Sequence, residues 1–136
     1  MIKVKKIDHV AVCVPKLDES IAHYGKLLGI EATDRDKVVP QKTEACMVNC
    51  GNTQIELITP MEGNIGLEKF LAARGTALHH IALEVEDIDG TLKRLDSAGV
   101  PLIDKVARPG LRGHRVAFLH PKAFGGVLIE LVEPSH

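Results

Sequence analysis

The sequence predicts an α+β fold of two paired βαβββ modules, whose strands form a curved mixed sheet around a metal-containing cavity. A strand-like segment with one histidine opens each half, at His9 and at His80. Each half later has an apolar strand that contains one glutamate, at Glu56 and at Glu130. The offsets are nearly constant, at 71 residues between the histidines and 74 between the glutamates. One module would expose a face of its sheet, and pairing two modules covers it.

The first module is expected over about residues 1–60. Its opening strand has valines at alternate positions and ends at Pro15. A helix follows, which Asp18 or the preceding turn caps and Gly29 stops. The rest of the module is expected to be three strands, at about residues 31–37, 44–50 and 53–59.

The second module repeats this order over about residues 77–136. A strand at about 77–85 leads through Asp87 into a helix that Gly99 stops. Between the modules, a linker over 61–76 holds a short helix. At 136 residues, the chain is expected to be one domain. The remaining strands are expected near residues 102–105, 115–120 and 127–132.

The composition argues against several classes of function. A net charge of −1, with no basic stripe along a predicted helix, indicates no basic surface that would bind nucleic acid. The longest apolar runs have the length of a strand, so no membrane span or signal peptide is expected. The three cysteines fit reduced thiols in the cytoplasm, and a mitochondrial chain without its targeting peptide would look the same.

Strand alternation places four polar residues on one face. The aliphatic residues that follow His9 and His80 at alternate positions, and those on both sides of Glu56 and Glu130, belong under the helices. This turns the four polar side chains the other way. A lone glutamate here is often solvated, and a lone strand histidine is more often hydrogen-bonded in the core. Four such residues at repeat-related positions favour a metal site, because unpaired carboxylates on a covered face are costly.

Two imidazoles and two carboxylates indicate an octahedral divalent ion rather than a structural zinc. Four protein ligands would fill a tetrahedral zinc site, whereas an octahedral ion keeps two positions for a chelating oxygen-bearing substrate. The candidates are Co²⁺, Mn²⁺, Ni²⁺ and Fe²⁺.

The motifs resemble those of the vicinal oxygen chelate superfamily, and the resemblance covers the whole chain. Within it, the methylmalonyl-CoA epimerase family is the nearest in pattern. The stretches that carry the resemblance are IDHVAV at 7–12, LHHIA at 78–82, and FLHPK at 118–122 leading to GVLIEL at 126–131. The last combination is the most specific.

The resemblance implies a metal-dependent R/S interconversion of methylmalonyl-CoA at C2, with Co²⁺ favoured, and a homodimer. In such a reaction one base removes the proton, the metal stabilises an enolate, and another base returns a proton to the opposite face. Position by position, the bases would be Glu44 and Glu130. The implied metal ligands are the residues that alternation selects: His9, Glu56, His80 and Glu130.

Other residues have weaker assignments. Arg115 and Lys122 are candidates to bind the phosphates of coenzyme A or the malonyl carboxylate, although a solvated loop explains them equally well. Cys46 and Cys50 are expected to be small buried thiols. His79 falls on the opposite face from His80 and is expected to be structural.

Three alternative functions stay open. A lactoylglutathione lyase (glyoxalase I)-like isomerase has the same ligand set, but its usual D-P-D-G turn is replaced here by HPKAFGG at 120–126. A ring-cleaving dioxygenase would hold iron with two histidines and one carboxylate, so Glu56 argues against it. A non-catalytic small-molecule-binding protein would line its cavity with aromatic residues, of which this chain has one Tyr and three Phe.

Overall fold

The structure is a computed structural model that describes residues 2–135. The chain divides into two compact units, residues 9–79 in one and residues 2–8 with 80–135 in the other. Strand β1 (Val4–Cys13) crosses the division, because its first residues group with the second unit. Each unit contains the strand and helix order of one βαβββ module, which confirms the predicted repeat.

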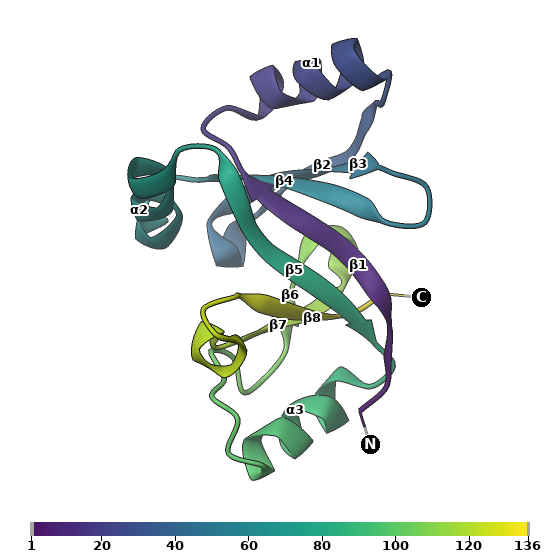
Figure 1. Cartoon of the computed structure of the whole chain (residues 1–136), viewed down its shortest axis with the longest axis vertical. Helices are drawn as coiled ribbons and strands as arrows, with labels where there is room; N and C mark the ends of the chain where they lie inside the picture. Colours follow the sequence, from purple (N-terminus) through teal and green to yellow (C-terminus); the bar gives the residue numbers. More distant parts are fainter. Residues whose placement is uncertain (1, 136) are drawn as a thin grey trace. The chain divides into compact units, whose positions relative to one another are not determined.

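The sheet of the first unit has the strand order β2-β3-β4-β1. β1 runs parallel to β4, whereas β3 is antiparallel to both β4 and β2. Helix α1 lies over one face of this sheet (Figure 1). The elements that follow β1 are α1 (Leu17–Leu28), β2 (Ala32–Val38), the 3₁₀ turn η1 (Val39–Gln41), β3 (Thr43–Asn49), β4 (Gln54–Pro60) and α2 (Ile65–Arg74).

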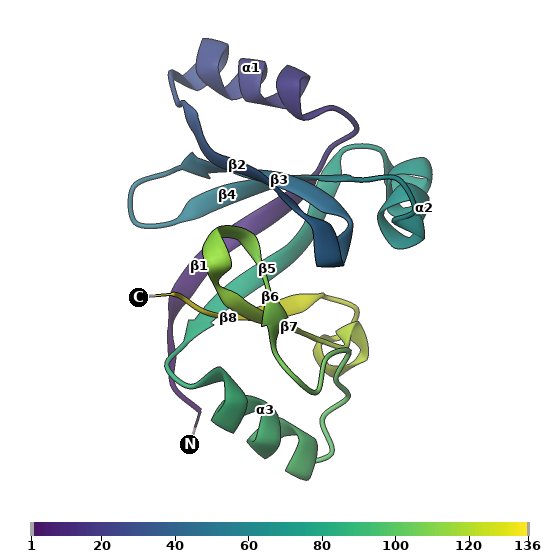
Figure 2. The same cartoon turned by 180° about the vertical axis from the view of Figure 1, so that it is seen from behind.

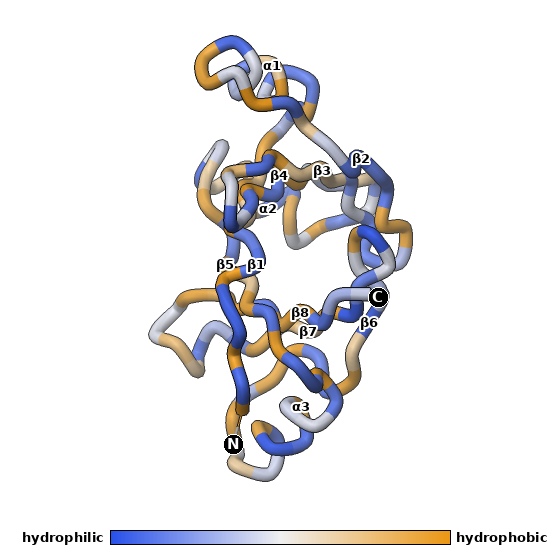
Figure 3. Tube along the Cα trace, turned by 90° about the vertical axis from the view of Figure 1, so that its right-hand side faces the viewer, coloured by the Kyte–Doolittle hydropathy of each residue, from blue (hydrophilic) through white to orange (hydrophobic). Residues whose placement is uncertain are grey.

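Helix α1 packs on this sheet through one apolar face. Apolar and polar residues alternate along the helix, as Figure 3 shows, and Leu17, Ile21 and Tyr24 contact the core that includes Leu57. Lys16 in the preceding turn is the N-cap residue, so of the two predicted alternatives the turn is right and Asp18 is not. Gly29 ends the helix as predicted, in the left-handed conformation at φ 68°.

The sheet of the second unit has the order β5-β8-β7-β6, seen from behind in Figure 2. β5 is parallel to β8, and β7 is antiparallel to both β8 and β6. The elements are β5 (Ala77–Val85), α3 (Ile88–Ser97), β6 (Arg108–Pro109), η2 (Leu111–Gly113), β7 (Arg115–Leu119), η3 (Pro121–Phe124) and β8 (Ile129–Glu133).

Helix α3 is fixed at its start and along one side. The Asp87 side chain accepts a hydrogen bond from the Gly90 N–H at 3.0 Å. A Cβ at position 90 would lie 2.3 Å from Asp87 Oδ2, so a larger residue there would displace the capping carboxylate. Ile88 and Leu92 then pack against a core that includes Leu131.

The strand predicted at 102–105 is wrong. Only an isolated bridge from Leu102 to Leu119 forms there, and β6 lies further along the chain. The Ile103 and Asp104 N–H groups both donate to the Phe118 carbonyl, and the Asp104 side chain accepts the Phe118 N–H at 2.9 Å. A side chain takes the place of a backbone acceptor, so the ladder stops.

The other predicted strands and helices are present within a few residues of their expected bounds. None of the helices in residues 2–135 has the length and hydrophobicity that a membrane-spanning helix requires.

We expect Ile88→Ala to lower the free energy of unfolding by about 2–5 kcal/mol, because it leaves a cavity at a fully buried position. The matched control is Leu27→Ala on α1, where the side chain is 79% exposed and the change should be within about 0.5 kcal/mol. Urea unfolding followed by circular dichroism measures both. Equal losses in the two variants would contradict the core assignment.

Candidate functional site

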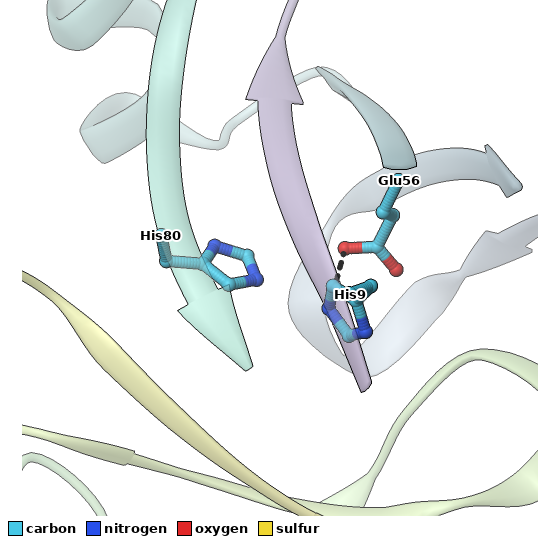
Figure 4. A group of neighbouring side chains, drawn as sticks. All are labelled: His9, Glu56 and His80. Carbon is cyan, nitrogen blue, oxygen red and sulfur yellow. Dashed lines mark ion pairs between the residues drawn. The ribbon is translucent and has the colours of Figure 1, made fainter. Parts of the chain in front are cut away.

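In the first unit, His9 and Glu56 lie on the sheet face opposite α1. Leu57 packs under the helix, so its neighbour Glu56 points the other way, together with its cross-strand partners Ala11 and Met47. His9 on β1 and Glu56 on β4 point toward one another in Figure 4, with His9 Nε2 3.4 Å from Glu56 Oε1. Both residues are buried, at 4% and 8% exposed.

The second unit repeats this arrangement. Ala82 pairs with Glu130, which puts His80 and Glu130 on the face opposite α3. His80 Nε2 lies 3.3 Å from Glu130 Oε1, and both residues are 5% exposed. Phe118, the cross-strand partner of Glu130, packs edge to face on the His80 ring at 5.1 Å between centroids. Phe118 was not predicted to lie at the site, although its alternation with Ala117 and Leu119 would have placed it on the face of Glu130.

Each pair has the chemistry and spacing of two ligands of one divalent ion. Separations of 3.3 and 3.4 Å are longer than an ordinary N–H···O bond. Two donor atoms, each about 2.1 Å from one ion, would themselves be about 3.0–3.4 Å apart. A buried carboxylate also needs a positive partner to offset its lost hydration. His9, Glu56 and His80 each offer a ligand atom, and the donor set therefore fits a divalent metal.

Glu44 contacts Arg35, and its predicted role as a catalytic base stays a prediction. Its strand neighbour Cys46 pairs with Leu57 in the α1 core, and Glu44 shares that face. The Glu44 carboxylate accepts a hydrogen bond from Arg35 Nε at 3.2 Å, and Arg35 Nη1 donates to Asp18 of α1. These two carboxylates raise the pKa of Arg35 above its ordinary value. Glu44 therefore belongs to a clamp between α1, β2 and β3.

Arg115 also faces a helix. Its two terminal nitrogens donate to the two carboxylate oxygens of Asp89 on α3, both at 2.7 Å, and this pairing lowers the pKa of Asp89. Glu133 lies 3.8 Å away. The guanidinium is thus used within the fold, on the face opposite His80, and its predicted contact with substrate stays a prediction.

Lys122 and His79 have different environments. Lys122 is exposed in η3, and its backbone N–H donates to His120 Nδ1 at 3.0 Å. Its predicted contact with substrate stays a prediction. His79 packs edge to face on Phe70 of α2 at 4.9 Å between centroids, which confirms a structural role.

The cysteines are not poised for catalysis. Cys46 lies in the α1 core as a buried thiol, as predicted, whereas Cys50 is exposed, so its predicted burial is wrong. Cys13 lies on the same face of β1 as His9 and is fully buried. Burial raises the pKa of both the Cys13 and the Cys46 thiols to about 11, so both stay protonated near neutral pH.

Known proteins share this arrangement of strands and helices. Residues 8–118 match the Glyoxalase/Bleomycin resistance protein/Dioxygenase superfamily. The mitochondrial methylmalonyl-CoA epimerase of Dictyostelium discoideum is 37% identical over 97% of this chain and 80% of its own length. The chain belongs to the methylmalonyl-CoA epimerase family.

Solved structures support the same family assignment. A methylmalonyl-CoA epimerase from Mycobacterium tuberculosis matches with a TM-score of 0.92 and 36% identity, over 98% of this chain and 90% of that one. A methylmalonyl-CoA epimerase in complex with methylmalonyl-CoA and NH₄⁺ matches with a TM-score of 0.91 and 29% identity, over 98% and 96%. The predicted fold class is confirmed.

We expect Glu44→Gln to bind Co²⁺ as the wild type does and to lose about 0–1 kcal/mol of stability, because it weakens only a partly exposed ion pair. Glu56→Ala should weaken Co²⁺ binding at least about tenfold, since even outer-shell changes cost metal affinity on that scale. Calorimetric titration with Co²⁺ compares the two variants. Loss of the metal in Glu44→Gln alone would reverse our assignment of the faces.

We also expect one thiol to react quickly with a disulfide reagent near neutral pH. Cys50 is exposed, whereas Cys13 and Cys46 are buried and protonated, so they should react only after unfolding. Release of the coloured thiolate counts the reactive groups, and Cys50→Ser should show none. Rapid labelling of Cys13 would mean that its side of β1 is open.

Proposed function

We propose that this chain catalyses the R/S interconversion of methylmalonyl-CoA at C2 with a divalent metal ion. The observation that carries the proposal is the matched pair of buried His–Glu contacts, at 3.4 and 3.3 Å, in repeat-related positions of a methylmalonyl-CoA epimerase family member. The residues that would hold the ion are His9, Glu56, His80 and Glu130.

We assign the two His–Glu pairs to one shared ion. Each pair supplies two ligand atoms and one negative charge when its histidine is neutral. Two pairs together supply four ligands and balance a dication. A bound ion supplies Lewis-acid stabilisation of the negative charge that develops on the thioester oxygen when C2 loses its proton. Which divalent ion serves in the cell, with Co²⁺ favoured, stays a prediction, as does the homodimer.

Glu130 is assigned to proton transfer at C2. It is the one of the two predicted bases whose side chain lies on the face of His80. Its neighbours on that face include the Phe118 ring and the buried Val116 and Val132. These apolar groups limit water around the carboxylate, which favours a proton transfer that water does not intercept. Glu44, the second predicted base, stays assigned to the proton transfer on the opposite face of C2.

We expect the protein with Co²⁺ to exchange the C2 hydrogen of methylmalonyl-CoA for deuterium in heavy water, well above a metal-only control. Glu130→Gln should lower the exchange rate by at least about 100-fold, because it removes a positioned general base. Glu44→Gln, which removes the second predicted base, should abolish the R/S interconversion and keep the bound metal. Cys50→Ser, at an exposed position, is the control that should keep the wild-type rate. Mass spectrometry follows the deuterium, with lactoylglutathione turnover measured in parallel. No exchange by the wild-type holoenzyme would refute the proposed function.

We expect one Co²⁺ per chain, bound by both units together. His9→Ala and His80→Ala should each remove most of the bound ion, because each takes away one ligand of the same site. Metal analysis after gel filtration gives the stoichiometry. Two ions per chain, with each variant losing only one of them, would mean that the units bind separately.

A further inference from the structure

Arg108 lies on the edge strand β6, on the opposite face from Arg115. Arg108 pairs with Val116, and Pro109 pairs with Arg115. Residues directly opposite in an antiparallel pair share a face. Because Arg115 reaches Asp89 of α3, the Arg108 side chain points away from α3.

That face of the second unit is the one that carries His80 and Glu130. Val116, the partner of Arg108, pairs in turn with Val132 and clusters with Ala82, which is the partner of Glu130. Arg108 is thus two strands from Glu130 and two residues along the sheet. This placement follows from the strand register of one unit alone.

Asp104 holds the Arg108 guanidinium by one edge. Arg108 Nε lies 3.2 Å from Asp104 Oδ1, and Asp104 Oδ2 accepts the backbone N–H of Phe118 at 2.9 Å. The Asp104 side chain is 13% exposed, whereas that of Arg108 is 39% exposed. The Asp104 carboxylate therefore links the Arg108 guanidinium to Phe118, which packs on His80.

The two arginines differ in how they are engaged. Arg115 makes a two-point contact through both terminal nitrogens, which is the contact that a guanidinium makes with a carboxylate ligand. Arg108 contacts Asp104 through Nε, and a guanidinium has five N–H donors in all. Its terminal edge has the geometry to take a second carboxylate.

We propose that Arg108 binds the free carboxylate that is attached to C2 of the substrate. This inference rests on the proposed function and names the group that distinguishes a malonyl thioester from a simple acyl thioester. The two ligand carboxylates already balance the charge of the ion, so the free carboxylate of the substrate adds a negative charge that a cation on this face would offset. A charge-assisted two-point contact supplies both affinity and orientation of C2.

The test compares two CoA esters that differ by this carboxylate. With the holoenzyme, Arg108→Met should raise the KM for methylmalonyl-CoA about 10–100-fold, as expected for a lost charged hydrogen-bond partner. The inhibition constant of propionyl-CoA, which lacks the carboxylate, should change less than about twofold because no charged contact is lost. Arg108→Lys should restore part of the affinity. Arg94→Met, the control at an exposed arginine of α3, should leave both constants unchanged.

The outcomes separate the possible sources of the anion. Equal weakening for both esters would assign Arg108 to the phosphates of coenzyme A and overturn the inference. Unchanged constants in Arg108→Met, confirmed as folded by thermal unfolding, would also overturn it. A wild-type enzyme that exchanges no deuterium defeats the proposed function instead. Calorimetric binding of the two esters to wild type and Arg108→Met then still tests the inference.

Discussion

The apolar contact between each helix and one face of its sheet is the interaction on which the site depends. Leu57 under α1 and Leu131 under α3 are held in the core by burial, worth about 25 cal/mol per Å² of apolar surface. The side chains of their strand neighbours Glu56 and Glu130 must then lie on the opposite face. A slip of one residue would turn both carboxylates into a hydrocarbon core. The cores thus offset the cost of keeping two His–Glu pairs buried.

This constraint explains what could be predicted from the sequence. Glu56 and Glu130 stand between aliphatic residues, and His9 and His80 are each followed by aliphatic residues at alternate positions, so alternation alone assigned their faces correctly. Alternation gives no face where both faces of a strand are buried. In β3, Ala45 to Val48 are all buried, so Glu44 was assigned from the family resemblance and not from a periodic pattern. The prediction that Cys50 is buried was wrong because β3 ends at Asn49, one residue before it.

The two units share a scaffold but not the residues on the site face. Glu56 and Glu130 stand opposite Met47 and Phe118, at equivalent positions of the two sheets. Two residues along, Ala45 is next to Asp36 in the first unit, where the second unit has Val116 next to Arg108. The Phe118 ring, which packs on His80, and the Arg108 guanidinium are thus both in the second unit. An asymmetric substrate requires such a difference between repeats, because identical halves would bind it equally well in two orientations.

The irregular backbone at 102–105 and the position of the Arg108 side chain have one physical cause. Asp104 accepts the Phe118 N–H, so the edge strand stops early and restarts at Arg108 as a two-residue strand. The same carboxylate holds the Arg108 guanidinium beside the face of His80 and Glu130. A regular strand over 102–105 would have used backbone acceptors and left no carboxylate to position the arginine. Local patterns fail where a structure gives up regularity for function, and Asp104 is such a place.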